Sequence, residues 1–317
     1  MEQKESRKYG YLAKEIGIRE NVGSIEKCAV LDKSFFGWDS FSIRCGLIGQ
    51  TGMITEESDK LHTHDYDQIL WFLSADPGNM LELGAQLEID LGAGAGGVRQ
   101  RMSTPSVVLI PAGTPHFSPV VTDLEKKFFF LSVNCSGELR ANVYDEKAKP
   151  GEDFGAWGEF RNEYKKNIQS LKFARKDPYH YGSALASDAG GIYTHVDAGS
   201  AAVPIPVSMS WQTVTKAHQL GPRRPDLTYA PHSHTYDEAL IFLSLDLDDL
   251  TELHAEAEFG FGIQGEDQEF FTITKAAAML APEGVYHLPL VFRKVEKPMI
   301  LITLSVNTGH TAPKQIG

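Results

Sequence analysis

Apolar and polar residues alternate along several short segments of the chain. Residues 83–91 carry an apolar side chain at every second position, and the segments 107–110, 128–133 and 299–304 are mainly apolar runs bounded by turn residues. Alternation with a period of two over six or more residues predicts a half-buried strand. The glycine-rich segment 92–97 predicts a hairpin turn. Many short strands joined by turns are typical of a β-sandwich or barrel.

The pattern occurs twice. HTHDYDQILWFLS at residues 62–74 matches HSHTYDEALIFLS at residues 232–244, at an offset of 170 positions. PAGTPH at 111–116 is answered by PEGVYH at 282–287 at offset 171, and LSVN at 131–134 by LSVN at 304–307 at offset 173. A repeat this long predicts two tandem domains. We place an N-terminal barrel at residues 1–145 and a C-terminal barrel at 179–317.

We interpret the segment between the copies, residues 146–178, as a connecting segment between the two barrels. It is charged and shows no strand alternation. Phe160, Tyr164 and Ile168 or Leu171 would share a face of a helix over residues 157–171, so we expect a short helical connection here.

Composition excludes several functions. The 317 residues are 42% apolar and 23% charged, which is the balance of a globular protein, and the formal net charge is −12. An acidic chain is a poor partner for nucleic acid or for an anionic membrane surface. There is no apolar stretch of 18 residues, no signal-peptide pattern, and only three scattered cysteines. We therefore expect a cytoplasmic protein with neither nucleic acid nor membrane as partner.

The repeated histidines carry the candidate chemistry. His62 and His64, like His232 and His234, are two apart and would share one face of a strand. Gln68 and Glu238 follow at the same distance in the two copies. A third histidine, His116 or His287, comes after each Pro-x-Gly turn, where strand pairing could bring it to the same place.

Three imidazoles and a carboxylate suit a first-row transition metal: Fe, Mn, Zn or Ni. Four protein ligands leave positions open on a five- or six-coordinate ion, as a catalytic metal requires. Gln68 offers an amide oxygen without charge, so the N-terminal site is expected to bind metal more weakly or to be a relic. Tyr66 and Tyr236 share the parity of the histidines, and we expect them to face a substrate pocket or to pack at its mouth.

These motifs resemble those of the cupin superfamily, and their duplication resembles a bicupin. The family pattern HxHxxxE followed by PxGxxH is met in full by the second copy, whereas the first copy has Gln68 in place of glutamate. The glycine that often closes the first motif is missing from both copies, where Ser74 and Ser244 stand nearby. The resemblance implies an all-β chain of two tandem double-stranded β-helix (jelly-roll) barrels, each with a metal inside.

The resemblance leaves the activity open, because one fold hosts many functions. The first hypothesis is a metal-dependent enzyme acting on a small polar molecule, of dioxygenase, isomerase or decarboxylase type. The alternatives are a non-catalytic module that binds a small ligand, and a structural protein with one decayed metal site. The oligomeric state also stays open, with a homodimer among the expectations.

Overall fold

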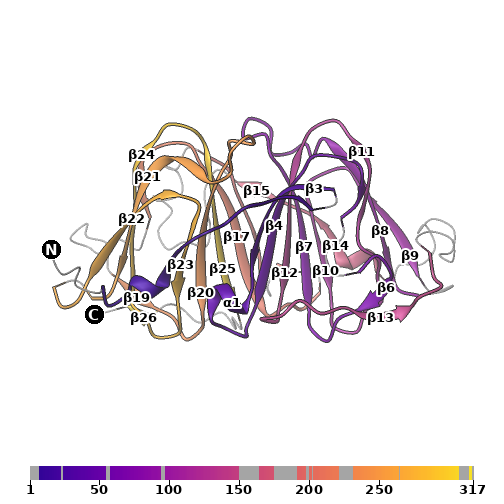
Figure 1. Ribbon diagram of the computed structural model, residues 1–317, viewed down its shortest axis with the longest axis horizontal. Coiled ribbons are helices and arrows are strands. Elements are labelled where there is room, and N and C mark those ends of the chain that lie inside the picture. The colour runs from indigo at the N-terminus through magenta and orange to yellow at the C-terminus, as the bar shows by residue number, and fades with distance from the viewer. Residues whose placement is uncertain are drawn as a thin grey trace. The chain divides into compact units, whose positions relative to one another are not determined.

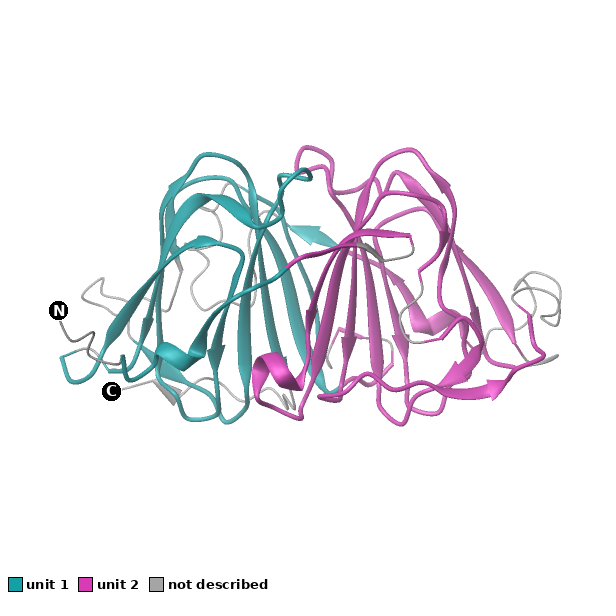
Figure 2. Ribbon diagram, in the orientation of Figure 1, with its two compact units in different colours: residues 1–17, 172–197, 206–317 teal, residues 18–171, 198–205 magenta. Residues whose placement is uncertain are grey.

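The computed structural model describes residues 7–22, 24–54, 58–93, 97–149, 164–174, 191–197, 200–201, 203–220, 231–263, 265–306 and 314–315. Most of their strands are labelled in Figure 1. The chain forms two compact units, coloured separately in Figure 2. One unit, here the N-terminal barrel, comprises Ile18–Leu171 and Ala198–Ile205; the other, the C-terminal barrel, comprises Met1–Gly17, Lys172–Asp197 and Pro206–Gly317.

The N-terminal barrel is built from antiparallel sheets. The larger has the order β14-β10-β7-β12-β4-β3-β2, a second has β5-β11-β8-β9, and β13 pairs with β6. Their bounds are β2 Arg19–Val22, β3 Ile25–Leu31, β4 Ser42–Ile48, β5 Gly52–Met53, β6 Leu61–Thr63, β7 Gln68–Ser74, β8 Ala85–Leu91, β9 Val98–Met102, β10 Ser106–Ile110, β11 Val120–Leu124, β12 Phe128–Asn134, β13 Asn142–Asp145 and β14 Ile168–Ser170. One short helix, α1 (Lys33–Phe36), follows β3.

The core of the N-terminal barrel lies between its two larger sheets. Phe72 of β7 and Phe130 of β12 pack in one cluster with Leu87 and Ile89 of β8. Strands β7 and β12 are buried along their whole length, which explains why they read as apolar runs in the sequence. Strand β8 alternates between buried and more exposed positions over its first half, as its period of two predicts.

The C-terminal barrel repeats this architecture. Its larger sheet has the order β1-β23-β20-β25-β17-β16-β15, and the facing sheet has β22-β21-β24-β19-β26, with β18 also pairing with β24. Their bounds are β1 Ala13–Glu15, β15 Phe173–Ala174, β16 Tyr193–Val196, β17 Val207–Val214, β18 His218–Leu220, β19 His232–Ser233, β20 Glu238–Ser244, β21 Glu252–Phe261, β22 Glu269–Lys275, β23 Ala277–Ala281, β24 His287–Val295, β25 Met299–Val306 and β26 Lys314–Gln315. The predicted all-β, two-barrel fold is confirmed.

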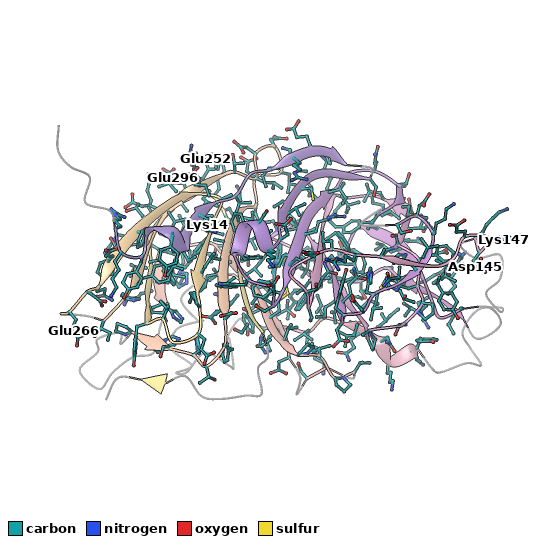
Figure 3. The ribbon with its side chains drawn as sticks, turned by 60° about the horizontal axis from the view of Figure 1, so that its bottom comes forward. Lys14, Asp145, Lys147, Glu252, Glu266 and Glu296 are labelled. Atoms are coloured by element: carbon teal, nitrogen blue, oxygen red, sulfur yellow. The ribbon has the colours of Figure 1, made fainter. Side chains whose placement is uncertain are left out.

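A short arm from the start of the chain completes the C-terminal barrel. The 3-10 turn η1 (Gly10–Leu12) leads into β1, which pairs with the edge strand β23; Lys14 of β1 is labelled in Figure 3. Tyr9 stacks on Phe261 with ring centroids 5.9 Å apart, and its hydroxyl donates to Asp267 at 2.8 Å. Residues 7–17 are hereafter called the N-terminal arm.

The N-terminal barrel has a corresponding arm. The 3-10 turn η3 (Lys165–Asn167) leads into β14, which pairs with β10 in the same way as β1 pairs with β23. The Asn167 side chain donates from Nδ2 to the carbonyl of Leu109 at 2.7 Å. Each barrel therefore gains a three-residue edge strand from an arm that the repeat in the sequence does not show.

The structure departs from the sequence-based expectations in three places. Of the helix expected over 157–171, residues 157–163 lie outside the described residues, and 164–171 form η3 and β14. The N-terminal arm packs in the C-terminal barrel, and residues 146–171 fall within the other unit, so the compact units differ from the boundaries 1–145, 146–178 and 179–317.

The third departure concerns the LSVN match. Gln68 pairs with Asn134, but Glu238 pairs with Ser305, so the two copies correspond at offset 171 here and not at 173. A shift of two residues keeps every side chain on the same face of the sheet, which is why the wrong alignment looked consistent. The structural counterpart of Asn134 is therefore Ser305.

Candidate metal centres

In the C-terminal barrel the four predicted ligands converge. His232 lies on β19 and pairs with His287 at the start of β24, while Glu238 begins β20. One nitrogen from each histidine and one oxygen of Glu238 all lie within 4.8 Å of one another. The Nε2 atoms of His232 and His234 are 3.1 Å apart, and the Nε2 of His287 is 2.9 Å from Oε2 of Glu238.

A turn fixes the third histidine beside the first two. The amide of Gly284 donates to the carbonyl of His234 at 2.9 Å, and that of Glu283 donates to Asp237 at 3.1 Å. Gly284 has φ +80°, a left-handed conformation that a side chain would strain. The N-terminal barrel builds the same turn, with Gly113 at φ +77° donating to His64. This explains why Pro-x-Gly precedes the histidine in both copies.

In the N-terminal barrel His62, His64 and His116 also cluster within 4.8 Å, and all three are buried. Each Nδ1 donates to a backbone carbonyl: His62 to Lys60 at 2.7 Å, His64 to Arg140 at 2.6 Å and His116 to Thr114 at 2.9 Å. A carbonyl can only accept, so the proton sits on Nδ1 and Nε2 keeps its lone pair. This is the tautomer of an imidazole prepared to bind a metal.

Gln68 occupies the position of Glu238. Both begin the equivalent strand and pair with the strand that ends in the Pro-x-Gly turn, Gln68 opposite Ile110 and Glu238 opposite Ala281. The Gln68 amide nitrogen donates to Oδ1 of Asn134 at 3.0 Å and to Ser132 at 3.3 Å. In the other barrel Ser305 donates to the Glu238 carboxylate at 3.1 Å.

Burial lowers the pKa of the N-terminal histidines, whereas hydrogen bonds lower that of Glu238. Burial lowers the pKa of His64 to about 4, and it lowers the pKa of His62 and, further, of His116. Burial alone would raise the pKa of Glu238, but hydrogen bonds with His234 and His287 outweigh it and hold that pKa well below its usual range. Neutral imidazoles and an ionised carboxylate are the forms that bind metals.

The donor sets fit a divalent transition metal. Three imidazole nitrogens and one carboxylate oxygen, all aimed at one buried point, match the preferences of first-row divalent ions. The N-terminal cluster supplies three imidazoles, with the Gln68 amide at the fourth position. The protein groups leave coordination positions open on a five- or six-coordinate ion.

The two tyrosines stack on the second histidine of each cluster. Tyr66 lies parallel to His64 with ring centroids 4.8 Å apart, and Tyr236 lies parallel to His234 at 4.5 Å. The Tyr66 hydroxyl donates to the carbonyl of Arg140 at 3.2 Å and accepts from its amide at 3.1 Å. Tyr66 thus supports His64 and the backbone that holds it; contact of either tyrosine with a substrate stays a prediction.

The C-terminal barrel also contains a buried pair that the sequence pattern did not predict. Nε2 of His195 lies 3.2 Å from Oδ2 of Asp197, and both side chains are almost fully buried. His195 lies opposite Ser210, which lies opposite Thr303, on the sheet that carries Glu238. The alternation of Tyr193, His195 and Asp197 was the available signal, but it covers too few residues to stand out.

No protein-family model matches the sequence, and no curated protein matches it significantly. Solved structures do match. The formate complex of Lactobacillus farciminis oxalate decarboxylase is 10% identical with a TM-score of 0.58, over 95% of this chain and 86% of that one. A structure of Bacillus subtilis oxalate decarboxylase at pH 4.6 is 12% identical with a TM-score of 0.56, over 94% and 76%.

Another Bacillus subtilis oxalate decarboxylase structure, from work on its Mn(II) centres, is also 12% identical, with a TM-score of 0.56 over 94% of this chain and 77% of that one. Identities this low show a shared fold and no more. The predicted fold, two tandem jelly-roll barrels, is confirmed by these likenesses.

Proposed function

We propose that this chain, with its two cupin barrels, is a metal-dependent enzyme that acts on a small polar molecule, with its catalytic site in the C-terminal barrel. His232, His234, Glu238 and His287 would hold a divalent transition metal there. The convergence of their four donor atoms within 4.8 Å is the observation that carries the proposal. A metal at that point supplies a Lewis acid that polarises a bound oxygen donor.

The surroundings of the cluster suit such chemistry. Phe259 lies parallel to the ring of His287 with centroids 6.2 Å apart, and both residues are buried. Ser305 fixes the Glu238 carboxylate from the neighbouring strand. An apolar wall excludes water and strengthens electrostatic interactions within the site, while fixed ligands keep the open positions in one place.

We propose decarboxylation of a small carboxylic acid as the reaction type, ahead of the dioxygenase and isomerase types. Two observations support this reaction type. The fold is similar to that of oxalate decarboxylases, and the imidazole and carboxylate donors of the cluster suit Mn(II). A carboxylate substrate can offer its oxygens to the open positions of such a site.

The test compares three full-length proteins loaded with Mn(II) or Fe(II): wild type, His234→Ala and His218→Ala. His218 is a matched control, because its Nδ1 also bonds to a carbonyl, that of Lys216, outside both clusters. A panel of small mono- and dicarboxylates is screened for release of carbon dioxide. We expect turnover by wild type and His218→Ala and a loss of at least 1000-fold in His234→Ala. Metal-loaded wild type without turnover, or with oxygen consumption alone, would contradict the decarboxylase proposal.

The small-molecule substrate is the partner that this function requires. Among the described residues no helix is long and apolar enough to cross a membrane. A cytoplasmic location and a homodimer complete the proposal; cell fractionation tests the first, and light scattering after gel filtration tests the second.

A further inference from the structure

An aspartate directly precedes the fourth ligand position of each metal cluster. Asp67 precedes Gln68, and Asp237 precedes Glu238. The carbonyl of Asp67 accepts the amide of Cys135 at 2.9 Å, which continues the pairing of β7 with β12 by one residue. Adjacent residues of a strand project to opposite faces, so the Asp67 side chain points away from the face that carries Gln68. Neither aspartate belongs to the two clusters of candidate ligands.

The two carboxylates make the same contact in both barrels. Oδ1 of Asp67 accepts a hydrogen bond from the backbone amide of Ala112 at 2.9 Å, and Oδ1 of Asp237 accepts one from the amide of Glu283 at 3.1 Å. Ala112 and Glu283 are the middle residues of the two Pro-x-Gly turns. Because the donor is a backbone amide, the contact persists although the side chain at this position differs between the copies.

Each Pro-x-Gly turn is therefore held to the chain that carries the first two histidines by two successive amides. The second amide is that of the glycine: Gly113 donates to the carbonyl of His64 at 2.7 Å, and Gly284 donates to that of His234 at 2.9 Å. A single hydrogen bond lets a turn pivot about it, whereas two adjacent bonds fix its orientation.

The turn in the N-terminal barrel orients the ring of the third histidine. Nδ1 of His116 donates to the carbonyl of Thr114 at 2.9 Å, and the amide of Thr114 donates to the carbonyl of Pro111 at 3.1 Å. A continuous series of bonds thus runs from the Asp67 carboxylate through the turn to the imidazole of His116.

The C-terminal barrel contains the same series. Nδ1 of His287 donates to the carbonyl of Val285 at 3.0 Å, and the amide of Val285 donates to the carbonyl of Pro282 at 3.0 Å. The agreement of two diverged copies, contact by contact, indicates that the arrangement serves the histidine and not one particular loop sequence.

From these contacts we infer that Asp67 and Asp237 are positioning residues of the two metal centres, each of which orients the third histidine through its Pro-x-Gly turn. A carboxylate suits this role because a hydrogen bond to a charged acceptor is stronger than one to a neutral acceptor. Loss of an outer partner of a metal-bound imidazole typically costs 10- to 100-fold in metal affinity. The inference rests on the metal site of the proposed function, but not on the reaction.

The test confines metal to one cluster of the full-length protein, with Co(II) as the probe. In the His64→Ala background only the C-terminal cluster is complete. Competition with a chromophoric chelator measures affinity, and the visible absorption of bound cobalt reports the arrangement of its ligands. We expect Asp237→Ala to bind Co(II) about 10- to 100-fold more weakly and with an altered spectrum. Asp237→Asn keeps an oxygen that accepts the same bond, so its affinity should stay within about threefold of the background and its spectrum should be unchanged.

The duplication of the barrel supplies the controls. Asp67→Ala in the His64→Ala background should leave the C-terminal cobalt site unchanged, and in the His234→Ala background it should weaken the N-terminal site. Asp123→Ala, at an exposed position of β11, controls for the loss of a carboxylate in the same barrel.

Unchanged affinity and spectrum in Asp237→Ala would overturn the inference, as would an equal loss in Asp237→Asn or a C-terminal cluster that takes up no cobalt. Cobalt binding is measured without turnover. A metal-loaded protein that releases no carbon dioxide would therefore contradict the proposed function and leave this inference intact, whereas an unaltered cobalt site in Asp237→Ala would contradict this inference alone.

Discussion

The side-chain amide of Gln68 donates to Oδ1 of Asn134 at 3.0 Å. Since the amide nitrogen can only donate, the carbonyl oxygen is the Gln68 atom that could ligate a metal. At the equivalent position of the other barrel, Ser305 donates to Glu238 instead. Each fourth ligand thus has a neighbour of matching hydrogen-bonding character, an acceptor for the amide and a donor for the carboxylate. This pairing favours a working N-terminal site over a relic.

Removing the acceptor should weaken that site. In Asn134→Leu the Gln68 amide loses the partner that sets its orientation, and we expect metal affinity of the N-terminal cluster to fall about 10- to 100-fold. Competition with a chromophoric chelator in the His234→Ala background measures it. Ser305→Ala in the same His234→Ala background is the matched control and should leave the metal affinity of the N-terminal cluster unchanged. Unchanged affinity in Asn134→Leu would show that Asn134 does not orient the amide.

Metal content should be about two equivalents per chain. His64→Ala and His234→Ala should each lose one, because each removes a ligand from a different cluster. Elemental mass spectrometry on untagged protein makes the measurement. One equivalent in wild type, lost only in His234→Ala, would instead make the N-terminal cluster a relic.

The metal-free protein should lose stability on acidification. The pKa of His64 in the folded chain is about 4, below its usual 6.5. Between pH 4 and 6.5 the unfolded chain therefore binds a proton at His64 that the folded chain does not bind. The stabilising effect is full above pH 6.5 and is lost as the pH falls toward 4, in total about 3 kcal/mol. His62 and His116 shift in the same direction and add to it.

Urea unfolding of chelated protein at pH 7, 6 and 5 tests this. His64→Gln should reduce the slope of stability with pH. Equal slopes for wild type and His64→Gln would show that His64 is not protected from protonation.

Much of the candidate site could be predicted because metal chemistry restricts residue type and spacing together. The histidines recur with fixed separations in both copies, and a strand period of two brings each pair to one face. The arms could not be predicted, because β1 and β14 have only three residues each and pair with strands that are distant in the sequence. The buried pair of His195 and Asp197 was missed because the alternation that contains it covers too few residues to stand out.

The N-terminal arm should stabilise the C-terminal barrel, although the two are distant in the sequence. Leu12 is 2% exposed in the C-terminal barrel, so Leu12→Ala should destabilise the protein by about 2–5 kcal/mol through the cavity it leaves. Chelator competition should show earlier loss of metal from the C-terminal cluster in urea. Tyr11→Ala, at an exposed neighbouring position, is the control and should change little. Loss of metal from the N-terminal cluster first would contradict the assignment of the arm.

The backbone conformation of His254 gives a further prediction. His254 has φ +50°, where its counterpart in the first copy is Gly84 with φ +71°. Nε2 of His254 lies 3.2 Å from Oδ2 of Asp246, and both side chains are partly exposed. We expect His254→Gly to be about 1 kcal/mol more stable than His254→Ala, because only glycine adopts this conformation without strain. Equal urea midpoints for the two variants would show that the backbone relaxes.

The two arms also set an order of assembly on the ribosome. β14 is made soon after the strands it joins, and the last residues of the N-terminal barrel, Ala198–Ile205, follow soon after it. The N-terminal arm is made first, yet the contact of Lys8 with Glu269 spans 261 residues. At about 5–20 residues per second, the arm waits on the order of tens of seconds for its partner strands. The C-terminal barrel can therefore close only after Glu269 and the strands around it are made, long after the N-terminal arm.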